Sequence, residues 1–253
     1  MENIINICMD KDKMINEEKI SELKEIAISV SKKLFDMKNE LYCHADDYTN
    51  LIFPKAINKG KPYTRISEQE ARFLFAFELE KRGIRFSVET PTVRKYNFKS
   101  KCGVESSGSI DLSIYDIGNE KYKRSTIVEF KAHTVTCIQD LEKLIKEPQQ
   151  DAVLFHVLES VNRGTLKTNT KNTKGLLLHY AGDLKKLISS KKIKFESNKN
   201  VVFFVCSLKP QFLIYKIFTD SDIINIDKFF ELDYIIDHKK VLFVKPNGWV
   251  ELK

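Results

Sequence analysis

Two acids and a lysine stand on predicted strands at positions where they could do chemistry together. Glu129 and Lys131 lie on one face of a predicted strand over residues 126–133, and apolar residues fill its other face. Asp111 stands in the same way on an earlier predicted strand, 109–114. Charged side chains on an apolar strand are costly to bury unless a partner or a reaction uses them. Two neighbouring strands of this kind would aim all three side chains at one spot, which would suit a hard divalent cation beside a phosphodiester.

A further acid could come from the helix predicted over residues 67–82, which ends at a glycine. Ser67 and Glu70 have the spacing of a capping box, which would give Glu70 a structural role. Glu70 also shares a predicted core-facing stripe, from which its carboxylate could reach toward Asp111. The apolar members of that stripe are Phe73, Leu74 and Phe77. Glu68, on another side of the helix, is the alternative acid, and we favour Glu70.

Composition places the chain among soluble globular proteins. It has 253 residues, of which 42% are hydrophobic and 30% charged, so it can form one large domain or one domain with an appendage. Its net charge of +7 is compatible with a polyanionic partner. The five scattered cysteines lack zinc-site spacing and read as reduced thiols in a cytoplasmic protein. No apolar run approaches the roughly 20 residues that span a bilayer, so no membrane association is expected.

Element order predicts an α/β (α+β) domain with a central mixed β-sheet flanked by helices. An amphipathic helix over about 16–40 follows a loosely ordered lead-in, and we assign residues 1–62 to an N-terminal helical extension and 63–253 to the main domain. The short polar connection between the Asp111 and Glu129 strands favours antiparallel pairing. Residues 152–158 are ambiguous between helix and strand. Further antiparallel strands are expected at 201–208 and 212–218, with a last hairpin over 241–252.

Several basic residues could contact an anionic substrate. Lys95 and Lys99 lie in a polar connection before the Asp111 strand, and Arg163 and Lys167 lie in a polar loop. For Lys95 and Lys99, a solvated hairpin is an equally good interpretation. His133 continues the polar face of the Glu129 strand and could touch substrate or tune Lys131, but we favour a hydrogen-bonded structural histidine.

The helix with Glu70, the Asp111 strand, the Glu129-Phe130-Lys131 strand and the following helix resemble the core of the PD-(D/E)XK nuclease superfamily. The match covers roughly residues 65–160 and is one of pattern and element order. Ile110 stands where the superfamily often has a proline before the aspartate. The resemblance implies a restriction-endonuclease-like fold, and it identifies no subfamily.

The resemblance also implies roles. Asp111 and Glu129 would ligate Mg²⁺ or Mn²⁺ with the backbone carbonyl of Phe130, and Glu70 would ligate directly or through water. Lys131 would orient the attacking water and stabilise negative charge. The expected activity is metal-dependent hydrolysis of phosphodiester bonds in DNA, in restriction, phage defence or repair, with RNA an open alternative. A nucleic-acid-binding or protein-interaction module without turnover is the competing function, and a homodimer or a protein partner also stays open.

Overall fold

The computed structural model describes most of the chain, and the side chains of its first helix are described over residues 17–38 only. The described residues are 2–43, 51–53, 66–97, 104–118, 121–133, 136–162, 164–167, 169–170, 173–190, 195, 198–237 and 240–253.

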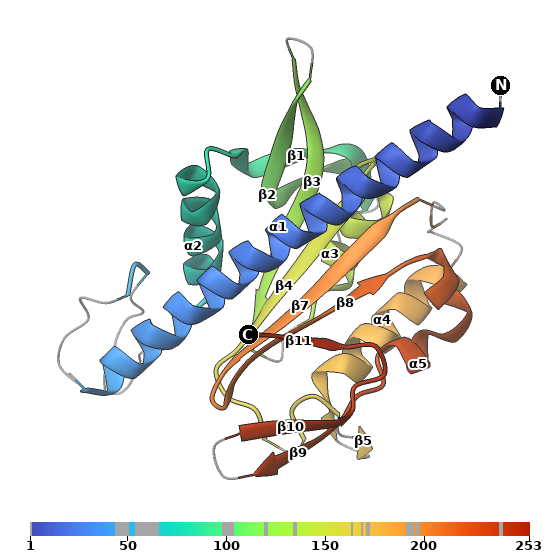
Figure 1. Ribbon diagram of the computed structural model, residues 1–253. Coiled ribbons are helices and arrows are strands. Elements are labelled where there is room, and N and C mark those ends of the chain that lie inside the picture. The colour runs from blue at the N-terminus through green and yellow to red at the C-terminus, as the bar shows by residue number, and fades with distance from the viewer. Residues whose placement is uncertain are drawn as a thin grey trace.

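A seven-stranded mixed sheet forms the centre of the molecule (Figure 1), in the order β1-β2-β3-β4-β7-β8-β11. β1, β2 and β3 pair antiparallel, β3, β4 and β7 pair parallel, and β7, β8 and β11 pair antiparallel. The strands are β1 (Arg85–Asn97), β2 (Glu105–Gly118), β3 (Lys121–Ala132), β4 (Asp151–Leu158), β7 (Asn200–Leu208), β8 (Gln211–Phe218) and β11 (Val250–Leu252). The predicted mixed sheet is therefore confirmed, as is the antiparallel pairing of the two strands that carry Asp111 and Glu129.

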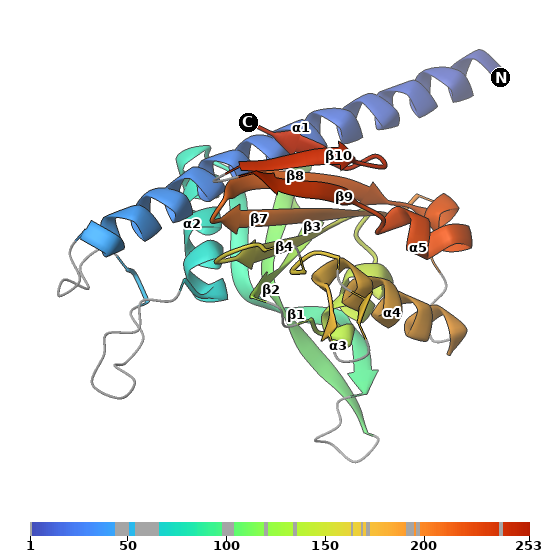
Figure 2. The same cartoon turned by 90° about the horizontal axis from the view of Figure 1, so that it is seen from below.

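Helices cover both faces of the sheet and give three layers (Figure 2). The helices in the described part of the chain are α1 (Glu2–Cys43), α2 (Glu68–Lys81), α3 (Ile138–Lys146), α4 (Leu176–Ser189) and α5 (Ile226–Phe229), with a 3-10 turn at Asp220–Asn225. α1 and α2 lie on one face, where α1 crosses the sheet at a slant (Figure 1). α3, α4 and α5 lie on the other face, because α3 and α4 are the crossovers between parallel strands.

Two apolar clusters, one on each face, hold these layers together. Residues of α1 and α2 pack with Phe130, Phe155 and Phe204 on one face, while α3, α4 and α5 pack with Phe203 and other residues on the opposite face. β4 and β7 lie at the centre of the sheet, and each is buried almost throughout. Such continuously apolar strands are typical of parallel pairs with both faces covered. This explains why the segment 152–158 was ambiguous between helix and strand and why it forms β4.

Three segments differ from their prediction. α1 begins at Glu2, so residues 2–15 belong to a helix and not to a loosely ordered lead-in. The predicted last hairpin is wrong, because β10 (Lys240–Lys245) pairs with β9 (Asp233–Asp237) while β11 joins the edge of the main sheet beside β8. A second small ladder, β5 (Asn169–Thr170) with β6 (Thr173–Lys174), lies within the loop predicted before α4. None of the helices in the described residues has a stretch long and apolar enough to cross a membrane.

Candidate active site

Asp111 and Glu129 meet on neighbouring strands at one end of the β2–β3 ladder. The ladder includes the pair Leu112–Val128, and Asp111 and Glu129 each lie one residue beyond that pair. The Asp111 carboxylate accepts a hydrogen bond from the backbone N–H of Phe130 at 2.8 Å. This bond joins the two strands through a side chain and fixes the Asp111 carboxylate against the Glu129–Lys131 segment.

Glu129 is the most enclosed acid of this group, with 1% of its surface exposed. Burial raises the pKa of Glu129 well above its usual range, and the carboxylates of Asp140 and Asp111 add to the rise, while Lys143 opposes it. Lys143 Nζ lies 2.5 Å from Glu129 Oε1, but the two atoms form an ion pair without hydrogen-bond geometry. A buried carboxylate oxygen without a hydrogen bond lowers the stability of the fold unless a cation compensates its charge.

Lys131 lies among carboxylates of two helices. Its ammonium is 2.8 Å from Asp140 of α3 and 3.8 Å from Glu68 of α2. Burial alone would lower the pKa of Lys131, but Asp140, Glu68 and Asp111 raise it above its usual range. Lys131 is therefore protonated at neutral pH, so it can supply positive charge but cannot accept a proton there.

Glu70, which we favoured as the helix acid, is directed elsewhere. Its buried carboxylate accepts hydrogen bonds from the backbone N–H groups of Phe53 at 2.6 Å and Ile52 at 3.3 Å. Burial raises the pKa of Glu70, and these two backbone hydrogen bonds oppose the rise. Among the described contacts, none joins Glu70 to Asp111, whereas the alternative acid, Glu68, lies beside Lys131. The structure thus brings Glu68 to the cluster, and Glu70 anchors the segment 51–53.

The reason lies in the orientation of α2. The helical stripe predicts Phe73 and Phe77 as core residues, but they are 48% and 46% exposed. Phe73 packs edge-on against Phe53, and Phe77 lies under the ammonium groups of lysines. The face that packs on the sheet consists of Ala71, Leu74, Phe75 and Leu79 together with Glu70 and Glu78. The Ser67 cap was predicted correctly, since its hydroxyl accepts a hydrogen bond from the backbone N–H of Glu70.

Arg72 and Glu89 complete the outer side of the cluster. The Arg72 guanidinium lies 3.4 Å from Asp111 Oδ1 and also pairs with Glu89 of β1. Glu89 is in the left-handed backbone region, with φ of 50°, and its carboxylate accepts a hydrogen bond from the Ser109 hydroxyl at 2.8 Å. A non-glycine residue in this region is uncommon and strained, and such strain is often found at functional sites.

Asp140 and Lys143 were not predicted from the sequence, although they lie at the centre of the cluster. The Lys143 ammonium contacts Asp140 Oδ1 at 2.9 Å, Glu129 Oε1 at 2.5 Å and the backbone carbonyl of Ser109 at 2.8 Å. Lys131 and Lys143 together lower the pKa of Asp140, against the effect of its burial. In the sequence they are an acid and a base three residues apart, beside the apolar stripe of α3. This spacing by itself is that of an ordinary surface ion pair on a helix.

His133 lies beyond the end of β3 and does not continue its polar face. Its φ of 68° turns the chain into the left-handed region, and its backbone N–H donates to Val157 at 2.7 Å. The buried His156 of β4 contacts the His133 carbonyl through Nε2 and the Tyr180 hydroxyl through Nδ1, the latter at 2.6 Å. These partners assign the ring proton to Nε2. Burial lowers the pKa of His156 to about 4.

The predicted substrate-contacting lysines and arginine are spread over the molecule. Lys95 is exposed on β1, where it pairs in register with Ser107 of β2. Lys167 pairs with Asp233 of β9, and no described contact links it to the cluster. Lys99 and Arg163 lie outside the described residues.

The cluster fits a hard divalent cation in its donor chemistry. Asp111, Glu129 and Asp140 supply carboxylate oxygens, the donor type that Mg²⁺ and Mn²⁺ prefer. The buried Glu129 Oε1 lacks a hydrogen bond and is ion-paired with Lys143. The described residues do not form a preassembled group of three or more metal-ligating side chains, and lysine and arginine engage the carboxylates of the cluster.

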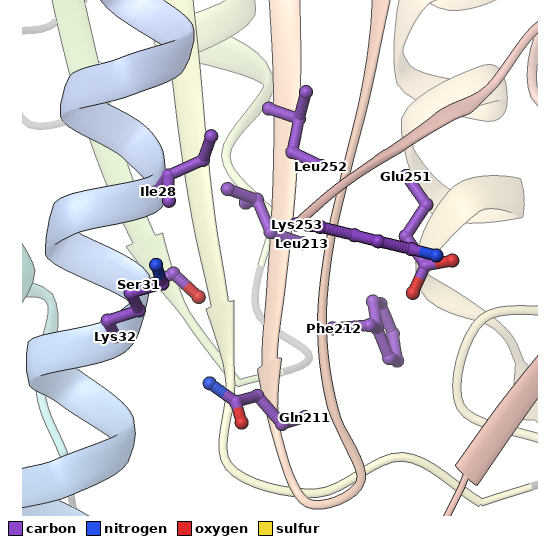
Figure 3. A pocket seen from close by; sticks show the side chains of 9 residues that line it. All are labelled: Ile28, Ser31, Lys32, Gln211, Phe212, Leu213, Glu251, Leu252 and Lys253. Atoms are coloured by element: carbon purple, nitrogen blue, oxygen red, sulfur yellow. The ribbon is translucent and has the colours of Figure 1, made fainter.

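A separate pocket lies between α1 and the edge of the sheet (Figure 3). Ile28 and Ser31 line it from α1, Leu213 from β8 and Leu252 from β11. It shares no residue with the acid–lysine cluster, so this pocket lies apart from the candidate active site. Comparison of the chain with protein-family models, curated proteins and solved structures finds no match.

Proposed function

We propose that this protein is a metal-dependent nuclease that hydrolyses phosphodiester bonds in DNA and has a restriction-endonuclease-like core. The observation that carries the proposal is the buried Glu129 carboxylate beside Asp111 and Lys131 on the central sheet. A fold does not need this group, because apolar residues at these positions would pack without the penalty of burying charge. The element order α2-β1-β2-β3-α3-β4 supports the resemblance to the PD-(D/E)XK core.

The residues have distinct parts in this proposal. Asp111 and Glu129 would hold the Mg²⁺ or Mn²⁺, and the Phe130 carbonyl would be a further ligand. Glu68 replaces Glu70 as the helix acid because it lies near Lys131. The bound cation would lower the pKa of a water and polarise the phosphoryl oxygen. Lys131, protonated at neutral pH, presents positive charge to the phosphate and is held on a strand, which fixes it better than a loop would.

A second candidate is a nucleic-acid-binding or protein-interaction module without turnover. The observation that favours it is the closed ion-pair network, in which Lys143 engages Glu129 and Arg72 engages Asp111. Such a network could hold the strands and helices together without binding a metal. A binding module of this kind predicts that removing divalent cations changes neither its stability nor its binding of partners.

Cleavage assays separate these two functions. Supercoiled plasmid, single-stranded DNA and RNA are incubated with the protein in Mg²⁺ or Mn²⁺, with EDTA as the control. The nuclease predicts metal-dependent cutting of DNA, and the plasmid products show nicking or double-strand breakage. Cutting of RNA alone would change the substrate class. No cutting of any substrate by folded protein would favour the binding module.

A further inference from the structure

Lys143 has the surroundings of a bound cation. Its ammonium contacts a carboxylate oxygen of Glu129 from β3, one of Asp140 from α3, and the backbone carbonyl of Ser109 from β2. Three oxygens from three different elements converge on one positive charge. Carboxylates joined by a backbone carbonyl are also the ligands that divalent cations take in proteins.

The fit between the ammonium and this oxygen cage is incomplete. Glu129 Oε1 is buried and close to Lys143, yet it receives no hydrogen bond with acceptable geometry. A metal ion imposes no donor direction on a carboxylate oxygen, whereas an N–H group does. The single charge of Lys143 also faces two carboxylates, and Asp140 is shared with Lys131. Among the described ion pairs, the buried Glu129 carboxylate is paired with Lys143, so a divalent cation in place of that ammonium would bring more positive charge to Glu129.

Lys143 can also leave the cage. Its side chain is a flexible four-carbon stem on the short helix α3 and is 10% exposed, so its ammonium can be displaced by rotation about side-chain bonds without a change in the backbone. Once displaced, the ammonium recovers its hydration, while Glu129 and Asp140 keep their positions on β3 and α3.

We propose that Glu129, Asp140 and the Ser109 carbonyl form a divalent-cation position that Lys143 fills in the metal-free protein and that the metal takes by displacing it. This inference rests on the proposed function and adds to it, because it gives Asp140 a ligand role and makes Lys143 a built-in competitor of the metal. The cation concentration at which the site loads is then set by how strongly Lys143 holds the cage.

Binding of Mn²⁺, followed by the electron paramagnetic resonance signal of the free ion, tests this competition without any activity assay. Lys143→Met keeps the length of the side chain and removes its charge, and we expect it to bind Mn²⁺ at least tenfold more tightly than the natural protein. Asp140→Asn should bind at least tenfold more weakly. Lys146→Met is the matched control on the same helix, where Lys146 pairs with Glu142, and it should bind within twofold of the natural protein. Equal or weaker binding by Lys143→Met would overturn the proposal.

The variant could be unstable without metal, because it leaves two carboxylates facing each other. Thermal unfolding with and without Mn²⁺ covers that case, since the proposal requires Mn²⁺ to raise the melting temperature of Lys143→Met by more than that of the natural protein. Failure of Mn²⁺ to restore a folded Lys143→Met or Lys143→Gln protein also overturns it. Plasmid cleavage by the natural protein is scored separately. If the natural protein cuts but Lys143→Met binds Mn²⁺ with unchanged affinity, this inference alone is refuted. If Lys143→Met binds Mn²⁺ more tightly but the natural protein cuts nothing, the nuclease alone is refuted.

Discussion

The carboxylate of Asp111 on β2 accepts a hydrogen bond from the backbone N–H of Phe130 on β3, at 2.8 Å. The contact lies just beyond Leu112–Val128, the last pair of the described β2–β3 ladder. The Asp111 side chain therefore helps to join the two strands and also belongs to the candidate site. Structure and chemistry at Asp111 can be separated by choosing a substitution that keeps the hydrogen-bond acceptor and removes the charge.

Asp111→Asn should therefore leave the fold intact and remove the activity. The amide oxygen can still accept from Phe130, so the melting temperature should change by only a few degrees. Loss of a ligand charge should lower the metal-dependent cleavage rate by roughly 100-fold or more. Cleavage rates and thermal melts of the same preparation check this, and cutting at the natural rate would remove Asp111 from the site.

Glu68 and Glu70, two residues apart on α2, should respond in opposite ways. Glu70→Ala leaves the backbone N–H groups of Phe53 and Ile52 without their acceptor, and we expect a loss of about 1–3 kcal/mol in the free energy of unfolding with little change in cleavage. Glu68→Gln should lower cleavage with little change in stability, because Glu68 is partly exposed and faces Lys131. Denaturant unfolding and cleavage assays on both variants decide between the two acids. The reverse pattern would restore Glu70 as the helix acid.

Glu147 should prove important for stability and not for chemistry. Its buried carboxylate accepts hydrogen bonds from the backbone N–H groups of Val93 and Arg94 and from the Tyr96 hydroxyl, at 2.9, 3.0 and 2.9 Å. These bonds hold the region where the β1–β2 register shifts. Glu147→Ala leaves three hydrogen-bond donors without their acceptor, so it should lower the free energy of unfolding by about 3 kcal/mol.

The control for Glu147 is Glu142→Ala on the same helical segment. Glu142 forms an i,i+4 pair with Lys146, and we expect less than about 1 kcal/mol from its removal. Urea unfolding of both variants measures the difference. Equal effects of the two substitutions would show that Glu147 does not anchor β1.

Stability should fall in mild acid because of His156. Its folded-state pKa of about 4 lies below the ordinary value of 6.5, so its contribution is complete above pH 6.5 and is lost as the pH falls toward 4. Over that window it amounts to roughly 3 kcal/mol. His156→Gln should show a shallower decline of unfolding free energy between pH 7 and 4, whereas the exposed His179→Gln should follow the natural protein. Parallel curves for all three proteins would contradict the assignment.

The sequence was sufficient to predict the strands of the candidate site. Strict alternation around Glu129 and Lys131, and a short polar connection to the Asp111 strand, predicted an antiparallel pair with the charged residues on one face, and the structure contains it. These signals are local, because a two-residue period and a short turn fix both the pairing and the side-chain direction.

The features that were missed depend on tertiary contacts. Phe73 and Phe77 looked like core residues of α2, but they pack against Phe53 and lysine ammonium groups at the surface, which rotates Glu70 away from the site. Lys143 contacts Glu129 because α3 packs against the sheet as the connection between β3 and β4. Helical periodicity in the sequence does not predict this placement. The pairing of β10 with β9 is different, because it joins consecutive strands and is local; it was missed because residues 233–237 were not predicted to form a strand.

The most direct test of the central claim is the Mg²⁺-dependent cleavage rate of Lys131→Met beside that of Lys123→Met. Both lysines lie on β3, but Lys131 is held among Asp140 and Glu68 while Lys123 is exposed. We expect Lys131→Met to be folded, to bind DNA and to cut it at least roughly 100-fold more slowly, and Lys123→Met to cut at the natural rate. Equal cleavage by the two variants, or equal cleavage in EDTA, would contradict the proposed active site.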